Sequence, residues 1–94
     1  MVDSVIDGAR LSAGFSQLTS LATATGVNAP KEAKAAIIQA ETQNIRWRDD
    51  GTAPTASVGM QLASGSSFLF TGNLQALQII EETASAKANI SFYK

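Results

Sequence analysis

The sequence predicts an all-β fold, a single antiparallel β-sandwich of about seven strands with an N-terminal arm. Segments with alternating apolar and polar residues recur roughly every 8 to 12 residues, and Gly, Pro, Asn and Ser lie between them. Long segments with a helical period of about 3.6 residues are missing, and so are repeats of fixed length. The 94 residues suffice for one domain. A helical bundle would require residues 31–39 and 74–87 both to be helical.

Residues 1–16 form the predicted arm, or at most a short and marginal helix. Their apolar side chains follow no sustained period, and Gly8 and Gly14 interrupt them. Each of these glycines would cost a helix about 1 kcal/mol. The sandwich domain is therefore expected to occupy residues 17–94.

The arm contains large apolar side chains that are candidates for contact with a partner, namely Val5, Ile6, Leu11 and Phe15. Such a segment is too apolar for a solvated tail. We expect it to bind a neighbouring subunit or another protein of an assembly and to become ordered there. The alternative is that Leu11 and Phe15 close one end of the domain's own core.

Residues 17–28 favour an extended strand, because Thr and apolar residues there share one parity. Residues 31–36 contain good helix formers, but a helix that short is marginal, so we expect a strand from Ala35 onward. The polar residues 42–44 favour a turn. Residues 35–48 are therefore expected to form a hairpin.

Further strands are expected after the turn-forming residues that follow Asp50. Gly59 lies inside the first of them and indicates a bulge or a close backbone approach. The last strand places Ala88, Ile90 and Phe92 on one face. The four segments are residues 58–62, 67–71, 74–83 and 88–93.

The composition excludes several classes of function. Seven basic and eight acidic side chains leave a net charge of −1, so nucleic acid is not an expected partner. Because the chain has neither His nor Cys, Ser-His-Asp triads, thiol nucleophiles and zinc sites built on these ligands are excluded. We expect no enzymatic activity, no cofactor and no metal. No apolar run is long enough to predict a membrane segment.

Charged residues make up only 16% of the chain, against about 25% in typical soluble domains. The polar surface must then consist largely of hydroxyl and amide side chains, which lose little free energy when a partner covers them. This composition favours a part of an assembly, either a homo-oligomer or a protein present in many copies.

The most distinctive run is Arg46, Trp47, Arg48, Asp49 and Asp50. In a functional interpretation, Arg46, Arg48 and Asp49 form a charged rim for a protein partner, with both arginines on the face opposite Trp47. In a structural interpretation, Trp47 packs in the core, Asp50 lies in a turn, and Arg48 with Asp49 holds the loop.

Catalytic and metal-binding patterns are weak. The carboxylate doublets at 49–50 and 81–82 cannot flank a sugar as a glycosidase pair does, because adjacent strand residues point to opposite faces. The spacing of a calcium loop and a glycine-rich phosphate loop are both missing.

The aromatic residues could be interpreted as a stacking platform for sugars or bases. Phe68, Phe70 and Phe92 occur at strand period beside apolar neighbours, however, and are expected in the core. Tyr93 lies on the polar face of the last strand. It is therefore expected to be partly exposed and is a further candidate for contact with a partner.

The segment IRWRDDGTAPTASVGM, residues 45–60, resembles a segment of small proteins encoded among bacteriophage and prophage structural genes. In that group it is followed by a Gly-containing turn, an aromatic strand ending in Thr-Gly, an apolar strand and a final strand of the Asn-Val-Ser-Tyr-Tyr kind. The corresponding segments here are residues 64–66, 68–72, 74–80 and 89–93. The resemblance covers roughly residues 17–93 and leaves the arm, residues 1–16, unmatched.

This resemblance implies a β-sandwich component of a phage virion, assembled in the host cytoplasm. The expected function is that of a non-enzymatic capsid decoration or cement protein, which binds the major capsid protein or other virion proteins. One alternative is a head-fibre or tail-associated module that contacts host surface glycans. Another is a head-completion or adaptor protein.

Overall fold

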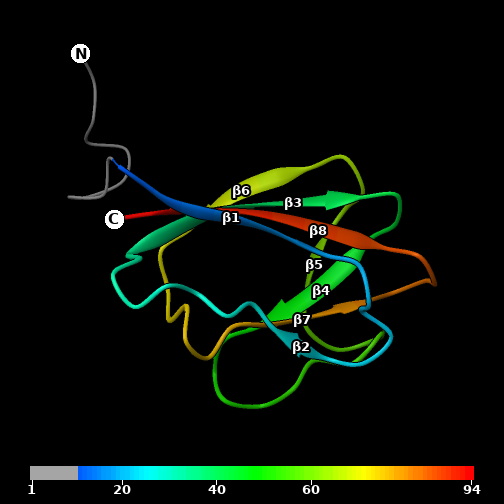
Figure 1. Cartoon of the computed structure of the whole chain (residues 1–94). Helices are drawn as coiled ribbons and strands as arrows, with labels where there is room; N and C mark the ends of the chain where they lie inside the picture. Colours follow the sequence, from blue (N-terminus) through cyan, green and yellow to red (C-terminus); the bar gives the residue numbers. More distant parts are fainter. Residues whose placement is uncertain (1–10) are drawn as a thin grey trace.

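The computed structural model describes residues 11–94. Within this range the chain forms eight β-strands and no helix. Figure 1 shows the strands in two layers, and each layer is a four-stranded sheet. The predicted antiparallel β-sandwich is confirmed, with eight strands in place of the roughly seven predicted.

The first sheet has the strand order β1-β8-β3-β6, and the second sheet has the order β2-β7-β4-β5. Every neighbouring pair of strands is antiparallel. The strands are β1 (Ser12–Leu18), β2 (Thr25–Gly26), β3 (Ala35–Glu41), β4 (Ile45–Arg48), β5 (Met60–Leu62), β6 (Ser67–Phe70), β7 (Gln78–Glu81) and β8 (Lys87–Tyr93).

The core lies between the two sheets and is built from the inward residues of the strands. β3 buries Ile38 and its second neighbours, because successive side chains in a strand point to opposite faces. β8 buries Ala88, Ile90 and Phe92, the face that the sequence predicts. The other large side chains that are fully buried are Leu21, Val27, Ile45, Leu77 and Ile79.

The expected hairpin of residues 35–48 is wrong, although both of its strands exist. β3 belongs to the first sheet and β4 to the second, so the turn at residues 42–44 crosses between the layers. Thr42 takes a positive φ of 78° in this turn. Alternation predicts which face of a strand is buried, but it does not say which sheet the strand joins.

Two predicted strands are shorter in the structure. Within residues 17–28, β1 ends at Leu18 and only Thr25–Gly26 pairs again, while Leu21 and Val27 enter the core from irregular backbone. In residues 74–83, a turn comes first, with the N–H of Ala76 bonded to the carbonyl of Asn73, and β7 begins at Gln78. In both segments apolar residues fill the core without a sheet partner, which periodicity alone does not reveal.

The predicted arm overlaps the sandwich. β1 begins at Ser12 and pairs with β8, so residues 12–16 lie in a sheet rather than in an arm or helix. Leu11 and Phe15 are about two-thirds exposed, at 66% and 67%, and do not close the core. Pairing with β8 provides backbone hydrogen bonds that do not depend on the side chains of β1. The register shifts between Ser12 and Gly14, where the glycine has a positive φ of 136°.

The four edge strands lie on two sides of the sandwich. β1 connects directly to β2 through residues 19–24, whereas Trp47 of β4 contacts Phe68 and Phe70 of β6. β1 and β2 therefore form one side of the sandwich, and β5 and β6 form the opposite side.

Candidate protein interface

A groove opens beside the end of β4 and has a volume of about 370 Å³. It is lined by residues 47–50 and 58–60, which come from β4, the turn after it, and the start of β5. The groove therefore contains two of the predicted contact residues, Arg48 and Asp49. We call it the β4–β5 groove.

The apolar wall of the β4–β5 groove is made by Trp47 and Met60, which are direct cross-strand partners in the second sheet. Their side chains lie on the same face of the sheet as those of Ile45 and Leu62, which is the face toward the core. Among the described residues 11–94, β5 is the last strand of its sheet, and the Met60 side chain at its start is 60% exposed. The wall is thus a continuation of the core that reaches the surface.

Trp47 is half-buried and packs against the core, so the expectation of a core tryptophan holds only in part. Its ring stacks on Phe68 with a centroid distance of 5.4 Å and meets the edge of Phe70 at 5.3 Å. This three-ring cluster joins β4 of the second sheet to β6 of the first sheet. Phe70 is buried and Phe68 half-buried, as the core prediction required.

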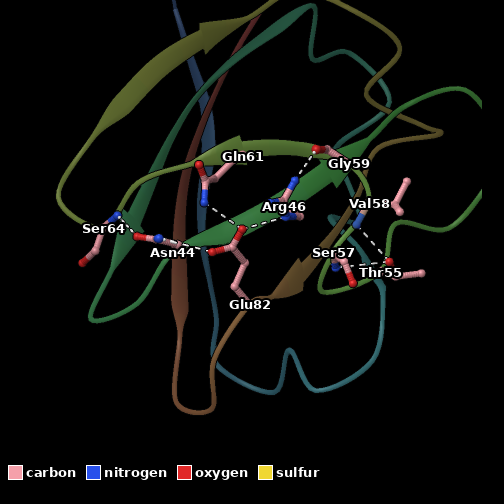
Figure 2. Close-up of polar contacts among 9 residues, drawn as sticks. All are labelled: Asn44, Arg46, Thr55, Ser57, Val58, Gly59, Gln61, Ser64 and Glu82. Carbon is pink, nitrogen blue, oxygen red and sulfur yellow. Dashed lines mark hydrogen bonds and ion pairs between the residues drawn. The ribbon is translucent and has the colours of Figure 1, made fainter.

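A tight turn presents Val58 at the rim of the groove. The backbones of Thr55 and Val58 exchange two hydrogen bonds, of 2.8 and 3.2 Å. The Thr55 hydroxyl accepts further bonds from the N–H groups of Ser57 and Val58, as Figure 2 shows. With its backbone held in this way, the Val58 side chain is 54% exposed.

Arg48 and Asp50 form the charged rim of the groove. Arg48 Nε donates to Asp50 Oδ1 at 3.0 Å, and Nη2 donates to Oδ2 at 2.5 Å. This pairing, helped by the N–H of Thr52, holds the pKa of the Asp50 carboxyl below its usual value. The predicted loop contact therefore exists, but its acid is Asp50 and not Asp49.

Arg46 does not reach the groove. It lies on the outer face of the second sheet, where Nη1 donates to the carbonyl of Gly59 at 2.9 Å (Figure 2). Its Nε lies 2.6 Å from Glu82 Oε2, a charge contact without hydrogen-bond alignment. Asn44 and Gln61 donate to the same carboxylate. Arg46 is thus engaged within the domain.

Partial burial alone would raise the pKa of the Glu82 carboxyl. The hydrogen bonds from Asn44 and Gln61 and the charge of Arg46 outweigh that effect and hold the pKa below its usual value. Glu82 is therefore ionised at neutral pH and joins the turn before β4 to β4 itself and to β5. This network could not be predicted from the sequence, because Gln61 and Glu82 are far from Asn44 and Arg46 along the chain.

The remaining predicted contact residues lie elsewhere. Phe15 projects from β1 on the outer face of the first sheet, and Leu11 precedes the same strand. Tyr93 is half-buried on that face, as expected, and its hydroxyl accepts a hydrogen bond from Ser91 Oγ at 3.1 Å. Val5 and Ile6 lie outside the described residues. The candidates thus divide among the groove, the outer face of the second sheet, and the β1 side.

Sequence reasoning missed the two most exposed apolar residues of the groove, Val58 and Met60. They share one parity with Leu62, and this pattern predicts a buried face. Met60 begins the edge strand β5, and Val58 lies in the turn before this strand, so both side chains are exposed. Gly59 between them makes the close backbone approach that was predicted, with a φ of 143°.

Neither a metal cluster nor a membrane-spanning helix is found in residues 11–94. No three carboxylates there are grouped to hold a metal ion. No helix long and apolar enough to cross a membrane occurs in that range.

No family model, curated protein or solved structure matches the chain. The two-sheet β-sandwich is therefore not assigned to a family.

Proposed function

We propose that this chain is a non-enzymatic structural subunit of a bacteriophage virion, a capsid decoration or cement protein that binds the major capsid protein in many copies. The observation that carries the proposal is the β4–β5 groove with its exposed Val58 and Met60. All of its lining residues belong to the segment 45–60, which carries the resemblance to phage structural proteins.

The groove has the composition of a protein contact site. Its centre is apolar, with Trp47 and Met60 facing each other, and its rim carries the Arg48–Asp50 ion pair. Protein interfaces combine an apolar centre with a polar rim, and aromatic residues, Met and Arg are enriched in them. A partner's apolar side chain seated in the groove would gain about 25 cal/mol for each Å² of apolar surface removed from water.

The surrounding surface adds little cost to binding. With charged residues at 16% of the chain, a partner that covers this domain displaces water mainly from hydroxyl, amide and alanine groups. A subunit that binds a capsid lattice at many equivalent sites benefits from such a surface, because each copy loses little free energy by desolvation.

The second candidate function is glycan binding, as in a head-fibre or tail-associated module. It is favoured by one feature, the presence of Trp47 beside the polar side chains of Asp49 and Asp50 in the same groove. Aromatic faces next to hydrogen-bonding groups suit sugar rings. The adaptor function has no specific observation in its favour.

The proposal is tested by co-sedimentation of the purified full chain with capsids of the phage whose genome encodes it, prepared without this protein. We expect saturable binding, and Met60→Lys should weaken it by about tenfold or more, because the charge enters the apolar centre. Ile37→Lys, an exposed apolar residue on the outer face of the first sheet, is the matched control. Equal binding by both variants, or no binding by the parent chain, would contradict the proposal. Binding to a glycan array in place of capsids would favour the second candidate.

A further inference from the structure

Within residues 11–94, β1 is an edge strand that lacks two of the usual protections against pairing with another chain, charged residues and proline. It has seven residues, whereas the other three edges, β2, β5 and β6, have two, three and four. Its sequence SAGFSQL contains no charge and no proline. Proteins normally protect long edges with charges, prolines or bulges. The single irregularity here, between Ser12 and Gly14, leaves the rest of the strand regular.

The hydrogen bonds of β8 show which backbone groups of β1 face the open edge. Leu11 and Lys94 exchange both of their backbone bonds, and Tyr93 directs its carbonyl to Lys34 on the other side of β8. Backbone direction alternates along an antiparallel strand, so Ser91 also faces away from β1. Phe15 lies opposite Ser91, so these two residues form a non-hydrogen-bonded pair. The N–H and C=O of Phe15 therefore point to the open edge.

The same alternation applies two residues further on, at Gln17, which is opposite Asn89. Within residues 11–94, two residues of β1 thus direct four backbone hydrogen-bonding groups to the edge without a partner strand. The regular part of the strand, residues 14–18, has Ser16 at its centre. An uncharged strand with its hydrogen-bonding residues placed evenly about one centre is complementary to itself.

We propose that β1 pairs antiparallel with β1 of a second copy of this chain, around a two-fold axis at Ser16. Each Phe15 would exchange both backbone bonds with Gln17 of the partner subunit, which gives four hydrogen bonds across the axis. The first sheet of one copy and the first sheet of the other would join into a single sheet of eight strands. The exposed Phe15 ring would lie across the join and cover the partner subunit's Gln17.

A second copy is the occupant that β1 itself favours. Self-pairing places no two charged side chains opposite each other, because β1 carries no charged residue. A two-fold contact also uses the same surface on both subunits, which closes the assembly as a dimer. The β1 edge lies on the side of the sandwich opposite the β4–β5 groove, so the groove stays open in the dimer. The inference does not depend on the proposed function.

The first test is cross-linking, which the chain permits because it contains no cysteine of its own. In the proposed dimer of Ser16→Cys, the Cα atoms of the two cysteines would lie about 4.5 Å apart, which is within disulfide range. Ser67→Cys is the matched control on β6, the other edge of the same sheet. Its two copies would be about 34 Å apart across seven strand spacings. We expect a disulfide dimer from Ser16→Cys under mild oxidation, and none from Ser67→Cys at the same protein concentration.

The second test measures association of the full chain by sedimentation equilibrium. We expect a monomer–dimer equilibrium in the parent chain, and Phe15→Lys should weaken the dimer by about tenfold or more, since it introduces charge at the edge. Val58→Lys, which changes an exposed apolar residue on the opposite side, should leave association unchanged. A chain that stays monomeric at all concentrations would overturn the inference. Equal cross-linking at both cysteine positions, or equal effects of the two lysine variants, would overturn it as well.

Discussion

Gly59 is the residue at which backbone geometry most directly shapes the β4–β5 groove. Its φ of 143° is one that L side chains rarely adopt. A Cβ there would lie 3.1 Å from the Pro54 Cβ and 3.2 Å from the Arg46 Cβ and the Trp47 carbonyl. The missing side chain lets the loop after β4 fold back onto this strand, and the Gly59 carbonyl then accepts a bond from Arg46.

Gly59→Ala should therefore destabilise the domain by about 2 to 4 kcal/mol, from backbone strain and crowding together. Gly65→Ala is the control, because Gly65 also has a positive φ of 86° but open space where a Cβ would lie. The control should cost only about 1 kcal/mol. Urea unfolding of both variants measures the difference. Equal losses of unfolding free energy would show that crowding at Gly59 does not contribute to the effect.

The residues of the run 46–50 show where sequence parity stops being informative. Arg46 is on the face opposite Trp47, as alternation predicts. Arg48 is the last residue of β4, and there the chain turns, so its side chain bends toward Asp50 and lines the same groove as Trp47. Parity holds only while the strand continues.

At the scale of elements, the Glu82 carboxylate holds the second sheet together on its outer face. It receives hydrogen bonds from Asn44, before β4, and from Gln61, in β5, and it is paired with Arg46 in β4. These partners come from three segments that the backbone ladder of β4 already joins. The network therefore reinforces the sheet at the β5 edge, where a three-residue strand has few backbone bonds.

This network predicts a specific acid sensitivity. Because the folded pKa of Glu82 lies below its ordinary value of 4.5, ionised Glu82 stabilises the fold above that value. The contribution is lost as the pH falls through the folded pKa. Glu82→Gln should therefore lower the melting temperature at pH 7 and have a much smaller effect near pH 3.

Glu81→Gln, at the neighbouring position in β7, serves as the control for thermal melts across this pH range. If Glu82→Gln lowered the melting temperature equally at both pH values, the effect would come from packing and not from the carboxylate charge.

The strands that the sequence predicted well are those with a full buried face. In β3 and β8, alternation over seven residues identifies both the strand and its inward side chains. β2 and β7 are short, and the core residues next to them, Leu21 and Leu77, lie in irregular backbone. Their positions depend on tertiary packing, which local periodicity does not contain.

Only part of the groove could be predicted from the sequence. The residue types and the resemblance of segment 45–60 indicate a functional region, and residues of this segment line the groove. The exposure of Met60 depends on β5 being an edge strand, and the turn that presents Val58 depends on Thr55. Sheet order and loop hydrogen bonds follow from long-range contacts, so neither could be predicted from alternation.

At the scale of the whole molecule, the two candidate contact surfaces lie on opposite sides of the sandwich. The β1 side carries exposed Phe15 and an unpaired strand edge, and the β5 side carries the groove with Met60. A subunit arranged in this way can bind another copy and a different protein at the same time. The proposed role as a subunit present in many copies would use both surfaces.

The proposal that this chain is a capsid-associated component of a phage virion has one decisive measurement, which is quantitative mass spectrometry of phage particles purified from the strain whose genome carries its gene. We expect the chain to be present at a copy number comparable to that of the major capsid protein. A copy number near that of a single ring would indicate the adaptor function. Absence of the chain from purified virions would refute the proposal.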